Sequence, residues 1–519
     1  MRILSGSNRP TLVRAAAAAP PALAQRVRLE RLSAVLERSA ARWTLGGCLL
    51  IVVLMRVPWL AAPLGRDEGG IALLAQHWGG GSLYGGYWLD RPPLLILLFK
   101  LAVLGGADGV RVLGMVAALA LVVAIALLAR LLAGPRAAVI AGLLAALLTG
   151  SSAIGAVYTP GELLAAVPST LSVLCLVHAH RSRRTGAVVA AGALAVTAVL
   201  VKQSFLDAGF AGVVFVLVSA LAERDVRIRW PVAYALGAAL PLLVVLAWLA
   251  VAGLSLSYFA YTMFGFRIDL LHTLSATDLP LVVRMRQLTD PAWHTGLTLV
   301  VGGAVVGALS GLRRDRVLFA TLAAWLAAGL VGVLCGGSYF VHYLIELVPA
   351  GCVLAAAGLA LVPAPISAAA LAIVAYMALG SADDGFRWLD NHTPHHRELA
   401  IGDYIREHAR PRDTVYVMYA RPNIAYYAGR RQPYPYLWSL MVRVRPDARP
   451  RLRRLLASPE RPTWLVGWHH PSSWELDPHH ALARTLNRGY RLAATVCNVP
   501  VYVRRDAAAP PGVAIGPCP

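Results

Sequence analysis

The sequence predicts a mostly helical membrane protein with many transmembrane spans and a small C-terminal α/β domain. Hydrophobic residues make up 58% of the 519 residues, more than the roughly 45–50% that is usual in soluble domains. The mean hydropathy is +0.61. Apolar runs of roughly 18–24 residues recur along the chain, and this length crosses a bilayer. A soluble protein would have to bury several wholly apolar helices in one core, so we set that alternative aside.

The net charge of +21 does not indicate a nucleic-acid-binding protein. Arginines are spread through short loops and both ends of the chain, as the positive-inside rule and attraction to anionic lipid or polyprenyl phosphate would produce. Only Lys100 and Lys202 are lysines. We interpret the arginine excess as a compositional bias, so the two lysines carry more information than any single arginine.

Residues 1–42 are rich in arginine, alanine and proline and contain no signal-peptide pattern. We expect them to form a basic cytoplasmic tail. A first span is predicted at about residues 43–60, with Arg56 near its far end and able to snorkel to the interface. The segment 61–93 would then emerge outside as a loop, with a short surface helix at about 71–78.

The segment Leu94–Leu104 decides the topology of everything after it. It is apolar but short for a span, and Lys100 interrupts it, so a re-entrant or surface segment fits better. If it does not cross, nearly every arginine cluster falls in the cytoplasm. The sequence then predicts eleven spans in a transmembrane domain of residues 43–381, at about 43–60, 110–130, 137–155, 163–180, 186–201, 204–222, 231–252, 293–312, 316–335, 340–361 and 365–381.

Residues 382–506 are predicted to form a soluble extracytoplasmic α/β domain. Helical patterns at 395–408, 449–457 and 479–487 alternate with β patterns at 414–419, 463–468 and 490–503, which favours a small, mostly parallel sheet. The tail 507–519 is predicted to be disordered. Cys497 and Cys518 could pair in this domain, but the sequence leaves that question open.

Charged residues beside the first predicted span are the first candidates for chemistry. Asp67 or Glu68 could act as the general base for an acceptor hydroxyl. Arg91 could bind a phosphate while Asp90 orients it, ahead of the rigid Pro92-Pro93 helix start. The alternatives are a solvated acidic loop and an arginine that contacts lipid head groups.

Three more candidates fall on the same predicted face. Glu162 begins a span, where an acid also complements the helix dipole. Lys202 ends a span, and His342 lies in a later outer turn. A snorkelling lysine and a structural histidine are the alternatives.

Taken together, these motifs resemble the GT-C membrane glycosyltransferases. The resemblance covers about residues 43–360 and looks closest to the protein O-mannosyltransferases, the ArnT-like lipid A transferases and related bacterial transferases. It rests on Asp67-Glu68-Gly69, Asp90-Arg91-Pro92-Pro93, Gly161-Glu162, Lys202-Gln203 and His342-Tyr343 with Pro349.

The resemblance implies a catalytic role for Asp67, Glu68 and Glu162. It implies a donor-phosphate role for Asp90, Arg91, Lys202 and His342, with Arg91 where relatives carry lysine. Gly70 departs from the pattern, because ArnT-like proteins have an arginine there. Metal dependence varies within the group, so a divalent metal cofactor stays open.

The predicted function is transfer of one sugar from a polyprenyl-phosphate donor to an acceptor hydroxyl on the outer face of the plasma membrane. We expect inversion at the anomeric carbon and a role in cell-envelope glycan, glycolipid or glycoprotein synthesis. Two alternatives are a transporter or flippase of lipid-linked sugars, expected to show inverted repeats, and a non-catalytic protein of envelope assembly. Neither the sugar nor the acceptor is predicted.

Overall fold

The computed structural model describes residues 43–79, 86–275, 281–335, 338–392, 396–507 and 513–514. The chain divides into two units, residues 1–47 and 48–519, and the contacts below all lie within the second. The predicted basic tail 1–42, nearly all of the tail 507–519 and Cys518 lie outside the described residues, so the Cys497–Cys518 pair does as well.

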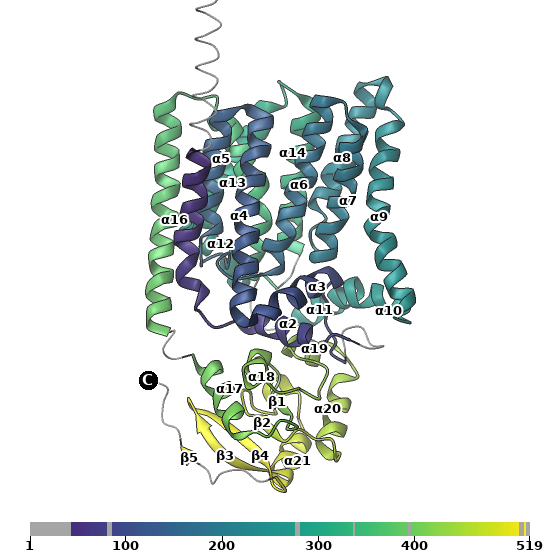
Figure 1. Ribbon diagram of the computed structural model, residues 1–519, viewed down its shortest axis with the longest axis vertical. Helices are drawn as coiled ribbons and strands as arrows, with labels where there is room; N and C mark the ends of the chain where they lie inside the picture. The colour runs from purple at the N-terminus through teal and green to yellow at the C-terminus, as the bar shows by residue number, and fades with distance from the viewer. Residues whose placement is uncertain are drawn as a thin grey trace, which may run out of the picture. The chain divides into compact units, whose positions relative to one another are not determined.

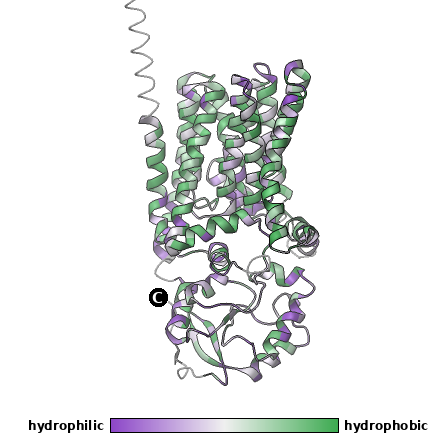
Figure 2. Ribbon diagram, turned by 45° about the vertical axis from the view of Figure 1, so that its right-hand side comes forward, coloured by the Kyte–Doolittle hydropathy of each residue, from purple (hydrophilic) through white to green (hydrophobic). Residues whose placement is uncertain are grey.

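Each predicted span coincides with an apolar helix. Seven described helices are long and apolar enough to cross a membrane, or eight if the bent pair α12 (Leu281–His294) and α13 is one span, and α5, α7 and α8 are shorter. Figure 2 shows that hydrophobic residues, drawn in green, predominate along these helices. The helices are Trp43–Leu60, α4 (Gly106–Ala133), α5 (Pro135–Thr149), α6 (Gly161–Ser182), α7 (Thr185–Val201), α8 (Asp207–Ala222), α9 (Arg229–Val251), α13 (Leu297–Gly311), α14 (Arg316–Cys335), α15 (Leu347–Leu359) and α16 (Ala364–His392).

Short helices lie across one end of this bundle, between it and the C-terminal domain (Figure 1). They are α2 (Arg66–Gln76), α3 (Pro93–Ala102), α10 (Leu256–Ala260) and α11 (Phe266–Ser275). The surface helix predicted at 71–78 therefore begins earlier, and Asp67 and Glu68 occupy its first turn instead of a loop. The segment Leu94–Leu104 forms a helix that Pro93 starts and a 3₁₀ turn after it.

Arg56 does not snorkel to the interface as predicted. Its side chain is buried, at 2% exposure, and donates hydrogen bonds to the backbone carbonyls of Thr149, Ala156 and Tyr158. An unpaired guanidinium inside the bundle would be costly, so these carbonyls hold it there. Arg56 thereby fixes the turn after α5 that leads to Glu162.

The C-terminal domain has a mixed sheet instead of the mostly parallel sheet predicted. Strands β1 (Val415–Val417) and β2 (Trp464–Val466) are parallel, but β4 (Val499–Arg504) runs antiparallel to β2 and to β3 (Tyr490–Val496). The order is β1-β2-β4-β3-β5, with the short β5 (Val513–Ala514) at the edge. The predicted β run 490–503 is a hairpin that turns at Cys497-Asn498, where both φ values are positive.

Helices surround this sheet. They are α17 (Arg397–His408), α18 (Pro422–Ala428), α19 (Ser439–Val444), α20 (Ala448–Ala457) and α21 (Ala481–Gly489). The helical patterns predicted at 395–408, 449–457 and 479–487 correspond to α17, α20 and α21.

The domain packs directly on α2 through Gly69 and Gly70. A Cβ atom on Gly69 would lie 2.4 Å from Cβ of Asn423, and one on Gly70 would lie 2.3 Å from the Trp438 ring. Asn423 also donates a hydrogen bond to the Leu64 carbonyl. Gly70, which departs from the ArnT-like pattern, is thus one of two positions where the C-terminal domain packs directly against the helix of Asp67.

Candidate active site

A cavity of about 590 Å³ lies where α2, the ends of the membrane helices and the C-terminal domain meet. Every site residue predicted from the sequence lines it. They are Asp67, Glu68, Asp90, Arg91, Glu162, Lys202 and His342. The structure therefore brings together five separate segments of the chain.

Asp90 joins two guanidinium groups. Its Oδ2 lies 2.8 Å from Arg91 Nη1 and 2.7 Å from Arg267 Nη2, and its side chain is only 6% exposed. Gln203 fixes the segment by donating to the Asp90 carbonyl at 2.6 Å. Burial would raise the pKa of Asp90, but the charges of Arg267, Arg91 and Lys202 outweigh it and lower the pKa. One ionised carboxylate thus faces two guanidinium groups, so the cluster is net positive.

Glu162 and Lys202 form a second buried pair. Glu162 Oε1 lies 2.6 Å from Lys202 Nζ and 3.7 Å from His342 Nε2. The two charged side chains are 2% and 5% exposed. Pro160 precedes α6 and places Glu162 in its first turn, where the helix dipole favours a carboxylate. The ammonium also lies 5.5 Å from the centre of the Tyr343 ring. Together with the Asp90 cluster, these residues form what we call the membrane wall, which comprises Asp90, Arg91, Glu162, Lys202, Arg267 and His342.

Asp67 stands apart because it is 47% exposed. Its Oδ1 accepts hydrogen bonds from Arg66 Nε at 3.2 Å and from Trp438 Nε1 at 3.0 Å. Although burial acts to raise the pKa of Asp67, the charges of Arg66, His342 and Arg91 lower it to about 2. Asp67 is therefore an ionised and accessible carboxylate at neutral pH.

Glu68 is engaged in structural contacts. One carboxylate oxygen accepts from Arg111 at 2.5 Å and from the Thr159 amide at 2.7 Å, and the other accepts from the Gly65 amide at 2.9 Å. Arg111 is fully buried and also donates to the Pro63 carbonyl. These contacts favour a positioning role for Glu68, which ties the start of α2 to the turn before α6.

Arg267, Arg421 and Trp438 also line the cavity, and the sequence did not single them out. Arg267 lies on α11, between the spans predicted at 231–252 and 293–312, and a lone arginine between Phe266 and Ile268 was its only signal. Arg421 and Trp438 come from the C-terminal domain, and nothing in their local sequence points to the membrane helices. Arg421 has a left-handed backbone (φ 61°) and pairs with Glu398 at 3.0 Å. We call the cavity side formed by Arg421 and residues 438–441 the domain wall.

The carboxylates of the cavity are paired with cationic side chains. Within the described ranges, no three His, Cys, Asp or Glu side chains are grouped so that they could hold an ion. The cavity carboxylates Asp67, Asp90 and Glu162 each face a guanidinium or ammonium group instead. The cavity can therefore bind an anion through its own cations and present a carboxylate to a neutral hydroxyl.

The comparisons with known proteins agree with the predicted resemblance. The family model described as dolichyl-phosphate-mannose-protein mannosyltransferase matches residues 90–250. No match is found among curated protein sequences.

Solved structures share the fold over nearly the whole chain. ArnT from Cupriavidus metallidurans bound to undecaprenyl phosphate is 17% identical, with a TM-score of 0.65 over 91% of this chain and 99% of that one. The oligosaccharyltransferase of Archaeoglobus fulgidus is 14% identical, with a TM-score of 0.54 over 91% of this chain and 73% of that one. The resemblance to the GT-C glycosyltransferases is confirmed, and this chain is a multi-pass membrane protein with their fold.

Proposed function

We propose that the chain is a membrane glycosyltransferase that moves a sugar from a polyprenyl-phosphate donor to an acceptor hydroxyl. The main evidence for this proposal is the distribution of positively and negatively charged side chains around one cavity. A net-positive cluster on the membrane wall, with buried Asp90, Glu162 and Lys202 and half-buried Arg91 and Arg267, faces the accessible carboxylate of Asp67. The GT-C fold supports the same reaction class.

The membrane wall suits the donor phosphate. Arg91 and Arg267 share the single carboxylate of Asp90, and Lys202 is buried nearby with Glu162. A polyprenyl-phosphate sugar is a phosphodiester, and its phosphate gains negative charge as the sugar leaves. Fixed cations aimed at that developing charge stabilise the transition state more than the ground state. The fold relative ArnT, solved with undecaprenyl phosphate, supports a polyprenyl donor.

Asp67 suits the acceptor side. Its accessible oxygen can accept a hydrogen bond from the attacking hydroxyl and then take its proton as the new glycosidic bond forms. With a pKa of about 2, Asp67 is a weak base in the resting cavity, so proton transfer would come late, when the oxygen already bonds the sugar. A phosphate leaving group needs no acid, so a single displacement with inversion is sufficient, unlike the two-carboxylate chemistry of glycosidases.

We place the reaction on the outer face of the plasma membrane, since the arginine-rich loops lie at the other end of the bundle. The domain wall would then select the acceptor, because Trp438 contacts Asp67 directly. The acceptor class and the sugar stay open, and cell-envelope synthesis is the process we propose.

The test uses membranes from a strain that lacks this chain, complemented with wild-type or variant protein and supplied with a labelled polyprenyl-phosphate sugar. We expect wild type to form a labelled product with a new glycosidic bond of inverted configuration. A transporter would move the label across the membrane without forming a new bond, and an assembly protein would do neither, so either result would reject the proposal.

A matched pair of variants separates the donor site from general attraction to lipid. Arg91→Ala removes a member of the buried Asp90 cluster, whereas Arg66→Ala removes a guanidinium that is 38% exposed on the same cavity. We expect Arg91→Ala to raise the KM for the donor more than Arg66→Ala does. Equal effects at equal protein levels would contradict the assignment of the membrane wall to the phosphate.

A further inference from the structure

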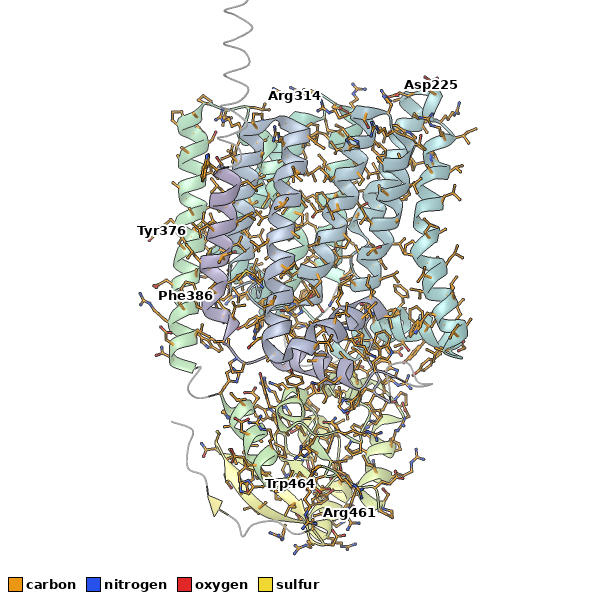
Figure 3. The ribbon with its side chains drawn as sticks, in the orientation of Figure 1. Asp225, Arg314, Tyr376, Phe386, Arg461 and Trp464 are labelled. Atoms are coloured by element: carbon orange, nitrogen blue, oxygen red, sulfur yellow. The ribbon has the colours of Figure 1, made fainter. Side chains whose placement is uncertain are left out.

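A second charged cavity lies at the other end of the helix bundle. Its volume is about 550 Å³. The ends of α4 and α6, the turn between α13 and α14, and residues of α15 form its walls. Figure 3 places Arg314, one of its lining residues, at the end of the bundle away from the C-terminal domain. It is therefore separate from the candidate active site.

The cavity has an excess of positive charge that the described residues do not neutralise. Arg181, Arg183 and Arg314 line it, with Asp315 as the one carboxylate among the lining residues. Arg183 is paired with Glu223. In the part of the chain that the structure describes, neither Arg181 nor Arg314 has a carboxylate within ion-pair distance.

Asp315 is occupied elsewhere. Its Oδ2 lies 3.2 Å from His180 Nε2, and its Oδ1 accepts a hydrogen bond from the Leu318 amide at 3.0 Å in the first turn of α14. The carboxylate therefore caps a helix and holds a histidine. It leaves the two arginines available for an anion from outside the chain.

Neutralisation of helix ends explains only part of this charge. Arg181 Nη2 donates to the Leu132 carbonyl at 3.2 Å, near the carboxyl end of α4, where a cation is favourable. Arg314 precedes the amino end of α14, where the helix dipole disfavours a cation and favours an anion. Helix-end neutralisation therefore does not account for Arg314. The positive-inside rule favours an arginine in this loop, and the place of the exposed Arg314 in the cavity wall suits an anion.

We propose that this cavity binds the phosphate head group of an anionic phospholipid from the membrane leaflet at that end. Basic pockets between membrane helices recognise such head groups, and a guanidinium can bind a phosphate with two parallel hydrogen bonds. The apolar side chains of Leu132, Leu318 and Phe319 line the same cavity and suit the glycerol and upper acyl carbons. Free phosphate offers the same oxygens without the apolar part.

The test uses the purified full-length protein, stripped of lipid in detergent and titrated with dioleoylphosphatidylglycerol or zwitterionic dioleoylphosphatidylcholine. Native mass spectrometry counts the bound lipids. We expect one phosphatidylglycerol to bind wild type about tenfold or more tightly than phosphatidylcholine, and Arg181→Gln/Arg314→Gln to lose that preference. Equal binding of the two lipids to wild type would overturn the proposal.

The matched control is Arg227→Gln/Arg313→Gln. It removes two exposed arginines that precede α9 and α14 but do not line the cavity. We expect this variant to keep the preference, and an equal loss would instead indicate attraction by the whole charged face. Arg314→Gln alone serves if the double variant does not fold, and unchanged binding would contradict the site.

Inorganic phosphate distinguishes the two sources of the anion. We expect excess inorganic phosphate to weaken phosphatidylglycerol binding to wild type without protecting the protein from thermal unfolding as the lipid does. If phosphate alone displaces the lipid and stabilises the protein equally, the cavity is a free-phosphate site and the lipid assignment is wrong. None of these readouts depends on transferase activity, so the result is independent of the proposed function.

Discussion

The membrane wall of the candidate active site differs from the acceptor side, where Asp67 lies on α2, in burial and in how its charges are held. On the membrane wall, Asp90, Glu162 and Lys202 are at most 6% exposed and are joined in short ion pairs, while the guanidinium groups of Arg91 and Arg267 are 20% and 24% exposed. Facing the domain wall, Asp67 is 47% exposed and is held by a partly exposed Arg66 and by one hydrogen bond from Trp438.

This difference suits a single cavity that binds two different substrates. The buried charges of the membrane wall are held in place, because any one that lost its partner would be strongly destabilising. It can therefore be preorganised for a phosphate that always has the same geometry. The Asp67 side is open and weakly held, as suits an acceptor that enters from outside and is selected by the C-terminal domain.

The largest effect is expected from Asp67→Asn, which keeps the shape of the open side but removes its charge. We predict a fall in transfer of about 10²–10⁴-fold, because a positioned proton acceptor contributes that much. Labelled product formation at matched protein levels measures it. Since the membrane wall is untouched, the KM for the donor should change little, and undiminished transfer would exclude Asp67 as the proton acceptor.

Arg111→Met tests the contacts of Glu68 that tie the start of α2 to the turn before α6. It leaves the carboxylate of Glu68 buried without its guanidinium partner, so we predict a loss of about 3–5 kcal/mol in unfolding free energy. Thermal unfolding in detergent provides the measurement. The double variant Arg111→Met/Glu68→Gln should recover much of the stability. If Arg111→Met is as stable as wild type, the pairing of Arg111 with Glu68 does not stabilise the fold. That result would favour the catalytic role that the resemblance implies for Glu68.

Arg267→Gln sharpens the definition of the membrane wall, since the sequence did not predict this residue. It removes one of two guanidinium groups on Asp90, and we expect transfer to fall about 10²–10³-fold, as for loss of one preorganised donor. Arg284→Gln is the control, because Arg284 lies between the same two predicted spans but does not line the cavity. Similar losses in both variants would remove Arg267 from the donor site.

Trp438→Phe isolates the contribution of the C-terminal domain. It keeps an aromatic ring beside Gly70 but removes the hydrogen bond to Asp67. A hydrogen bond to a charged group contributes about 1.5–3 kcal/mol, so we predict a loss of about tenfold or more in kcat/KM for the acceptor and little change for the donor. An equal effect on both substrates would mean that the two walls do not act separately.

The smallest effect is expected from pH. Because the pKa of Asp67 is lowered to about 2, this carboxylate stays ionised from neutral pH down to about pH 4. Its lowered pKa contributes stability that is present above the unfolded pKa and is lost only as the pH falls towards 2. The rate of transfer by wild type should therefore show no decrease between pH 5 and pH 8 that is due to protonation of Asp67. Glu460→Gln, which changes an exposed residue that does not line the cavity, is the control and should behave in the same way. An acid limb in that range that Asp67→Asn abolishes would contradict this account.

All of the membrane wall except Arg267 could be predicted from the sequence, because charge in an apolar chain is conspicuous. Asp90, Arg91, Glu162, Lys202 and His342 each adjoin an apolar segment, and the positive-inside rule placed them on one face. The spans themselves follow from length and hydropathy.

The domain wall could not be predicted, because Trp438 and Arg421 are ordinary residues of a soluble domain and only tertiary packing brings them to Asp67. The hairpin at Cys497-Asn498 was missed because it lacks the usual glycine. The sequence placed Arg56 at the membrane interface and gave Arg111 no role. Both are buried, because backbone carbonyls bind Arg56 and the carboxylate of Glu68 binds Arg111, and these partners are distant in the chain.

The most direct measurement is an experimental structure of the protein with a bound polyprenyl phosphate. We predict that its phosphate lies within hydrogen-bond distance of Arg91, Arg267 and Lys202, and that its lipid chain leaves the cavity between the membrane helices. A phosphate seated away from these three residues, either beside Arg421 or in the basic cavity at the other end of the bundle, would contradict the assignment of the membrane wall to the donor.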